Sequence, residues 1–304
     1  MSKPNSKVFP PQSIYFLHIP KTGGTSLNKL LRSYYKPKRW LPVYELPQLL
    51  QLSRQKINSY KCFGGHFGTG LFSLLDRPVD SMTMLRDPFE QFISNIHFVR
   101  RYCLNEYNPA NYSEHDRQTY NELINIFSKD DYIERIIDYP PMSKNFINCQ
   151  SRQLGCELDL QPLLGKSTPD VTVEKLIWDQ ADMDAIFYAA KCRLDNMAVV
   201  GILESFADSC RLVCNLLQIH VYGTYPEINV SNERQQNVHS SYRQLGVVSS
   251  SLANKIDELL QYDHKIYDYG KLIFQSQLEI LNSKPPRDSN HLRKLMAKVR
   301  ALLG

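Results

Sequence analysis

The sequence has no long apolar run, and this absence excludes a membrane-spanning helix. The longest apolar stretches, such as residues 197–203, are far shorter than the roughly 18–20 residues that a spanning helix needs. The N-terminal residues also lack the apolar core of a secretory signal peptide. We therefore expect a cytoplasmic protein without a signal peptide or a transmembrane segment.

Paired cysteines are missing as well. None of the seven cysteines stands in a Cys-x-x-Cys pair, and their number is odd. This usage excludes a zinc ribbon and argues against a disulfide framework, so we expect reduced thiols. The sequence also has no internal repeat and no low-complexity tract.

The body of the chain has no excess of charge of either sign. The net charge is +5, and residues 284–304 alone supply that excess. Their basic residues are Lys284, Arg287, Arg293, Lys294, Lys298 and Arg300, against Asp288. The remaining residues balance, so no broad basic surface for nucleic acid is expected. After Pro285-Pro286, this tail has the pattern of an amphipathic basic helix suited to an anionic membrane surface or a protein partner.

What is present is enough apolar sequence for a large core. Of the 304 residues, 42% are hydrophobic and 22% are charged, as in globular proteins. Strand patterns occur at 13–19, 60–63, 79–85 and 197–202, and helix patterns at 27–35, 45–55, 88–103, 171–192, 204–218, 248–261 and 263–281. Strands that alternate with helices predict an α/β fold with a P-loop-like central parallel sheet flanked by helices.

We expect one α/β domain over residues 1–283 and the basic helix over 284–304. Within the domain, residues 103–155 have helical patterns and no strand, which predicts a helical insertion. Its first part, 103–138, has eight acidic and three basic residues. If this part borders the active site, it should repel a strongly polyanionic acceptor.

The first chemical motif follows the first strand. Residues 20–26 read Pro-Lys-Thr-Gly-Gly-Thr-Ser. A glycine pair between a strand and a helix N-terminus lets backbone N–H groups converge on an anion, and here Lys21 adds charge while Thr22, Thr25 and Ser26 add hydroxyl groups. The lysine precedes the glycines, unlike the loop of nucleotide triphosphatases. We interpret the motif as a phosphate cradle; a bland tight turn is the alternative.

The second motif follows the third strand. Arg86 stands at the carboxyl end of that strand, which is the edge where open α/β sheets bind ligands. Ser94 lies two turns into the next helix, whose start is marked by Asp87 as N-cap, Pro88 and Glu90. Arg86 and Ser94 together suit a second phosphate. The alternative for Arg86 is an ion pair at the helix start.

Together these segments resemble the sulfotransferase superfamily that uses 3′-phosphoadenosine 5′-phosphosulfate (PAPS). The likeness is to the branch of heparan sulfate 2-O-sulfotransferase and its bacterial relatives. Residues 16–26 are similar to the loop for the 5′-phosphosulfate, residues 84–94 to the 3′-phosphate site, and residues 65–67 to the segment with the histidine general base. That enzyme has a second histidine two positions earlier, where this chain has Gly64.

The resemblance implies a role for each matching residue. The residues implied to bind the donor are Lys21, Thr22, Gly23, Gly24, Thr25, Ser26, Arg86, Ser94 and Arg234. His66 and Lys21 are implied to be catalytic, and Gln150 and Arg152 to bind the acceptor. PAPS is the implied sulfuryl donor, no metal is required, and the partner is a hydroxyl-bearing acceptor such as a glycan or a small or lipid-linked molecule. His66 is suited to take a proton near neutral pH. We interpret His18 as a satisfied core or sheet-edge histidine.

Two other functions remain open from the residues alone. A P-loop kinase-like phosphotransferase would need magnesium and ATP, and the order of lysine and glycines argues against it. A non-catalytic nucleotide-binding module would keep both anion sites without transferring a group.

Overall fold

The central parallel sheet is confirmed. The computed structural model describes residues 13–111, 114–140, 145–166, 171–177, 180, 182–218 and 241–283. Its strands are β1 (Ile14–Leu17), β2 (Cys62–Gly65), β3 (Asp80–Leu85) and β4 (Val199–Ile202). They form one sheet in the order β2-β1-β3-β4, with parallel pairing throughout. The chain therefore has the expected α/β class with a P-loop-like sheet.

Strand β1 is an inner strand of the sheet, and none of its four side chains is exposed. A strand covered on both faces is typical of a parallel sheet with helices on each side. Leu17 pairs with Gly65 of β2 and with Thr83 of β3, and Leu85 pairs with Ile202. The carboxyl ends of the four strands therefore meet at one edge of the sheet.

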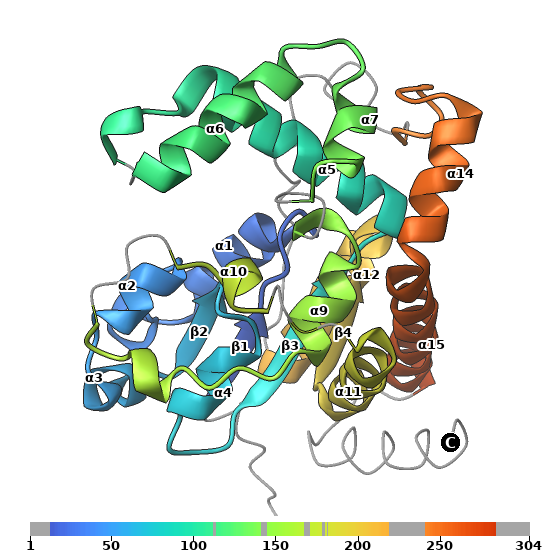
Figure 1. Ribbon diagram of the computed structural model, residues 1–304. Coiled ribbons are helices and arrows are strands. Elements are labelled where there is room, and N and C mark those ends of the chain that lie inside the picture. Colours follow the sequence, from blue (N-terminus) through green and yellow to red (C-terminus); the bar gives the residue numbers. More distant parts are fainter. Residues whose placement is uncertain are drawn as a thin grey trace, which may run out of the picture.

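Helices cover this sheet on both faces (Figure 1). The main ones are α1 (Gly24–Tyr34), α9 (Cys149–Gly155), α11 (Met183–Asn196), α12 (Phe206–Leu217) and α15 (Gln261–Ser283). Helices α12 and α15 pack on β4, and α11 packs on α9 and α15. The main hydrophobic core lies between these helices and the strands.

A second hydrophobic cluster lies beyond the carboxyl edge of the sheet, where Figure 1 shows a separate group of helices. These helices are α5 (Pro88–Arg101), α6 (Glu114–Phe127), α7 (Tyr132–Ile137) and α14 (Ser250–Leu259). The segment expected as an insertion thus contains α6 and α7. Helix α9, from the same range, packs instead against the main core through Leu154.

Two of the expected helices are divided. The helix expected at 45–55 is α2 (Leu46–Leu50) followed by α3 (Arg54–Ser59), because the Ser53 hydroxyl accepts from the Lys56 amide and starts a new helix. The helix expected at 171–192 is α10 (Val173–Ile177) followed by α11, because Asp182 caps α11 at the Ala185 amide. Both side chains satisfy N–H groups of a first turn, which favours a helix start over a continuous helix.

Short elements connect these parts. They are α4 (Leu71–Leu74), the 3₁₀ turns η1 (Pro37–Arg39), η2 (Gly68–Gly70), η4 (Pro109–Asn111), η5 (Gln161–Leu163) and η6 (Leu203–Ser205), and the π-helical turn η3 (Tyr102–Glu106). Within the described ranges, no helix combines the length and the apolar character needed to cross a bilayer. All seven cysteines are free thiols, and only Cys192 is exposed. Arg234 and the basic segment 284–304 lie outside the described residues.

Candidate active site

The turn between β1 and α1 has the backbone expected of an anion cradle. Lys21 and Gly23 have positive φ values of 65° and 87°. The helix begins at Gly24 with Gly23 as its N-cap, and no described side chain caps it. The Ser26 amide donates to the Gly23 carbonyl at 3.2 Å. The first two N–H groups of α1, those of Gly24 and Thr25, have no partner within the helix and point to the space before it.

Both glycines of this turn are required by their surroundings. A Cβ atom on Gly23 would lie 2.5 Å from Leu203 Cδ1, and the positive φ adds strain for any other residue. A Cβ atom on Gly24 would overlap the imidazole of His18. The close approach of the α1 N-terminus to this histidine therefore depends on the absence of a side chain.

The hydroxyl groups of the turn are placed differently from one another. The Thr22 hydroxyl is fully buried and donates to the Ile19 carbonyl at 2.9 Å. It therefore stabilises the turn, and its proton is not available to an anion, contrary to our expectation for Thr22. The Ser26 side chain is buried, whereas that of Thr25 is exposed.

The two predicted anion motifs are in direct contact. Arg86 Nη1 donates to the Lys21 carbonyl oxygen at 3.0 Å, and Gln91 Nε2 donates to the Pro20 carbonyl oxygen at 3.0 Å. Arg86 is 5% exposed, and its Nη2 lies 3.6 Å from Glu90 Oε2. The ion pair that we considered as the alternative for Arg86 is thus present, together with the contact to the first motif.

Lys21 lies among other cations instead of beside a carboxylate. Its Nζ is 4.7 Å from the centre of the Phe98 ring, which Arg101 also faces at 5.5 Å. Burial, with the nearby guanidinium groups of Arg101 and then Arg86, lowers the pKa of Lys21 to about 8. Because the Lys21 ammonium has no compensating charge among the described residues, a bound anion would stabilise its charged form strongly.

His66 follows β2 directly and lies beside the first motif. Its Nδ1 is 3.1 Å from the His18 carbonyl oxygen, and its ring stacks on the His18 ring with centroids 4.5 Å apart. Because a carbonyl oxygen only accepts, Nδ1 of His66 carries the proton and Nε2 has the free electron pair. The His66 amide also donates to the Tyr44 carbonyl at 2.9 Å, which holds the backbone.

His18 is buried and satisfied, as we expected. Its Nδ1 bonds to the Tyr44 hydroxyl, and 5% of the residue is exposed. Burial above all, and then His66 and Lys21, hold the pKa of His18 well below its usual value. The His18 ring is therefore neutral. It lies between the His66 ring, on which it stacks, and Gly24 at the N-terminus of α1.

The position of the missing second histidine is filled by other side chains. A Cβ atom on Gly64 would overlap the side-chain oxygen of Asn28 and lie 3.0 Å from the Trp40 ring. A histidine could not enter here without a shift of these two buried residues. The absence of a side chain at position 64 is therefore required by the packing of Asn28 and Trp40.

The three remaining expected site residues within the described ranges differ in their surroundings. Ser94 is half-buried on α5, one turn before Phe98. Arg152 donates from Nη1 to the Gln180 carbonyl at 2.7 Å. Gln150, which we expected in the acceptor cleft, is corrected: its side chain is fully buried and bonds to the backbone of Arg86, so it offers nothing to an acceptor.

Sequence reasoning missed several residues around these motifs. Phe98 and Arg101 follow Ser94 at helical spacing on α5, and this spacing was the available signal. Tyr44 stands in a loop, and its contact with His18 has no local signature. Among the described residues, no group of three or more His, Cys, Asp or Glu side chains is arranged to hold a metal ion.

Comparison with known proteins identifies the family of the chain. The model of the sulfotransferase family matches residues 4–270, which span both anion motifs, His66 and most of the helices around the sheet. A search of curated proteins found no match. The matched range covers most of the chain, and the chain belongs to the sulfotransferase family.

Proposed function

We propose that this chain transfers the sulfuryl group of PAPS to a hydroxyl group of a glycan or of another small or lipid-linked acceptor. One observation carries the proposal: the 3.0 Å bond from Arg86 Nη1 to the Lys21 carbonyl brings the two anion motifs together. His66 lies beside them through its bond to the His18 carbonyl. One donor with phosphates at both ends would thus span both motifs next to a base.

The residues present fit such a donor. The N–H groups at the start of α1 and the Lys21 ammonium suit the 5′-phosphosulfate, while Arg86 and Ser94 suit the 3′-phosphate. When bound, PAPS supplies an activated sulfuryl group with a phosphate as the leaving group. Lys21 would hold its positive charge where negative charge grows on that phosphate, and losing one such donor commonly costs about 10²–10³ in rate.

His66 would act as the general base. Its Nδ1–H donates to the His18 carbonyl, so Nε2 can accept the proton of the acceptor hydroxyl as that oxygen attacks. The stacked, neutral His18 ring fixes the plane of the His66 ring without adding a competing charge. A base positioned in this way typically contributes about 10²–10⁴ in rate.

Most acidic residues of segment 103–138 are paired with basic side chains in the part of the chain that the structure describes. Five of its eight acidic residues form ion pairs, and three of the bases (Arg101, Lys175 and Lys255) come from outside the segment. These pairs reduce the field that a polyanionic acceptor would meet. The acidic residues therefore leave the proposed hydroxyl-bearing acceptor free to carry charge.

A transfer assay tests the proposal. The full chain is incubated with ³⁵S-labelled PAPS and a panel of glycans, small alcohols and lipid-linked sugars, with and without EDTA. We expect label in at least one acceptor class, insensitivity to EDTA, and loss of transfer in His66→Ala. Phosphate transfer from ATP that requires magnesium would favour the kinase alternative. Tight binding of adenosine 3′,5′-bisphosphate without any transfer would favour a non-catalytic module.

A further inference from the structure

Gln150 fixes the backbone of Arg86 by a two-way pair of hydrogen bonds. Its Oε1 accepts from the Arg86 amide at 3.0 Å, and its Nε2 donates to the Arg86 carbonyl at 2.9 Å. Arg86 follows directly after Leu85, the last residue of β3 that pairs with β4. The fully buried amide of Gln150 thus continues the pairing by one residue beyond the edge of the sheet.

Asp263 in turn fixes Gln150. Its carboxylate accepts from the Gln150 amide at 3.1 Å through Oδ2, and from the Ser151 amide at 2.7 Å through Oδ1. Asp263 is fully buried, although it stands in the first turn of α15. Both carboxylate oxygens therefore accept hydrogen bonds from the first turn of α9, which carries Gln150.

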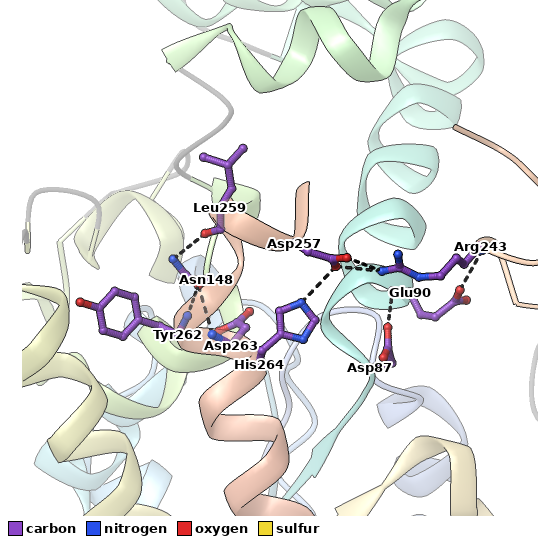
Figure 2. A network of polar contacts seen from close by, with 9 residues as sticks. All are labelled: Asp87, Glu90, Asn148, Arg243, Asp257, Leu259, Tyr262, Asp263 and His264. Atoms are coloured by element: carbon purple, nitrogen blue, oxygen red, sulfur yellow. Dashed lines mark hydrogen bonds and ion pairs between the residues drawn. The ribbon is translucent and has the colours of Figure 1, made fainter. Parts of the chain in front are cut away.

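The cap between these two helices is reciprocal, and Figure 2 shows the half of it that Asn148 makes. Asn148, which precedes α9, accepts from the Tyr262 and Asp263 amides at 3.2 and 3.1 Å, and donates to the Leu259 carbonyl at 3.0 Å. It does so with a positive φ of 51°, a conformation that asparagine tolerates better than most residues. Each helix N-terminus is thus capped by a side chain of the other, which fixes α9 relative to α15.

The Arg86 side chain is held by a second set of contacts, which runs through Glu90 and Arg243 to Asp257 of α14. Glu90, its ion-pair partner, accepts from the Arg243 amide at 3.3 Å. The Arg243 guanidinium donates to both oxygens of Asp257 at 2.8 and 2.9 Å and lies 4.1 Å from the centre of the Phe89 ring. Figure 2 shows Glu90, Arg243 and Asp257 in a line that leads from α5 to α14. Backbone and side chain of Arg86 are therefore both anchored, by separate routes.

We infer that Asp263 and Gln150 are positioning residues for recognition of the 3′-phosphate of the donor, acting through the backbone of Arg86. Neither side chain contacts the ligand, because both are fully buried and bonded to backbone groups. The inference rests on the proposed function, which assigns the 3′-phosphate to Arg86. A guanidinium recognises phosphate by directed hydrogen bonds, so a small displacement of its backbone weakens that recognition.

The chain offers a matched control for loss of a buried glutamine. Gln277 of α15 is also fully buried, and it pairs with β4 in the same manner: Oε1 accepts from the Val200 amide at 3.1 Å, and Nε2 donates to the Ala198 carbonyl at 3.4 Å. These contacts lie at the opposite end of the strand from the anion motifs. Gln277→Met therefore removes equivalent bonds without reaching Arg86.

The test compares two nucleotides that differ only in the 3′-phosphate. Calorimetry on the full chain gives the Kd of adenosine 3′,5′-bisphosphate and of adenosine 5′-monophosphate for the unaltered protein, Asp263→Asn, Gln150→Met and Gln277→Met. We expect the preference for the bisphosphate to fall at least tenfold in the first two variants and to stay within twofold in Gln277→Met. A purely structural role would weaken both nucleotides alike.

The outcomes separate this inference from the proposed function. A preference that is unchanged in Asp263→Asn and Gln150→Met overturns the inference alone. An unaltered protein without any preference for the bisphosphate overturns the proposed function and the inference with it. Should neither variant fold, hydrogen exchange of the unaltered chain decides: the bisphosphate must protect residues 86–91 and 148–155 more than the monophosphate does, and equal protection overturns the inference.

Discussion

The Nδ1 atom of His66 lies 3.1 Å from the backbone carbonyl oxygen of His18, which joins two histidines 48 positions apart. This bond assigns the proton of His66 to Nδ1 and leaves Nε2 as the basic atom. His18 contributes through its backbone and through the stacking of its ring, while its own imidazole nitrogen is engaged with Tyr44. The two histidines thus have different tasks.

Replacing His66 should abolish turnover without loss of nucleotide affinity. We expect His66→Ala to lower kcat by about 10²–10⁴, because it removes the base and no contact with the phosphates. The Kd of adenosine 3′,5′-bisphosphate, measured by calorimetry, should change less than about threefold. The control is His264→Ala, a half-buried histidine bonded to Asp257 on the α14 side, which should keep its kcat. Full turnover in His66→Ala would remove His66 from the mechanism.

Lys21 should make nucleotide binding depend on pH above about 8. Its pKa is lowered to about 8 in the free protein by burial and by the charges of Arg101 and Arg86. A bound phosphate favours the charged form, so above this pH binding must take up a proton. Affinity should then fall up to about tenfold per pH unit between about pH 8 and 9.5.

Calorimetry of adenosine 3′,5′-bisphosphate binding from pH 7 to 9.5 measures this slope. Lys21→Arg is the matched control, because a guanidinium stays charged over the whole range and should flatten the curve. Arg101→Gln should move the break to higher pH, since it removes the charge with the largest effect on Lys21. Equal slopes in the unaltered protein and in Lys21→Arg would contradict the assignment.

Gly24→Ala should damage activity as well as stability. The new Cβ would overlap the His18 ring, which is held by Tyr44 on one side and by the stacked His66 ring on another. Overpacking of this kind costs about 1–3 kcal/mol in free energy of unfolding, and the shift reaches His66 directly.

Urea unfolding and kcat together distinguish this effect from a general loss of stability. The control is Gly246→Ala, where a new Cβ meets no atom within 4 Å but the positive φ of 62° still costs about 1–2 kcal/mol. Gly246→Ala should therefore lose stability and keep its kcat. If Gly24→Ala also keeps its kcat, the close contact with His18 has no role in positioning His66.

The sequence was sufficient to predict the parts of this site that have local causes. A run of apolar residues predicted β1, and the Asp87 cap predicted the start of α5, which the 3.0 Å bond from the Glu90 amide confirms. A parallel sheet places both motifs at one edge, but the approach of Lys21 and Arg86 also needs β1 and β3 to be neighbours, a strand order that the sequence did not predict. The division of the helix expected at 171–192 shows the limit of periodicity, since one cap at Asp182 outweighed it.

The parts that depend on distant contacts were not predictable from a single sequence. Gln150 has a polar side chain in a short helix, and nothing nearby indicates that its partner is the Arg86 backbone, 64 positions earlier. The same holds for Asp263, whose position near the start of a helix is equally typical of an exposed residue. Such buried polar pairs form only once tertiary packing has brought their partners together.

Asp263 should also give the stability of the protein a distinctive dependence on pH. Burial raises the pKa of this carboxyl to about 6. The hydrogen bonds from Ser151 and Gln150 lower the pKa, but they offset only part of the effect of burial. A folded-state pKa above the unfolded value means that the folded chain binds the proton more tightly. The contribution of the group to stability is therefore fully present below about pH 4 and is lost as the pH rises through about 6.

The comparison of the unaltered protein with Asp263→Asn isolates this contribution, because the amide does not titrate. Urea unfolding gives the free energy of unfolding of both proteins. Between about pH 4 and 7, the unaltered protein should lose about 3 kcal/mol of stability relative to Asp263→Asn. A difference that is independent of pH would show that the carboxyl is not perturbed by burial. The predicted shift is a cost in stability at neutral pH that an uncharged cap would avoid. In return, the carboxylate accepts from the Gln150 and Ser151 amides, the two bonds by which it holds Gln150 against Arg86.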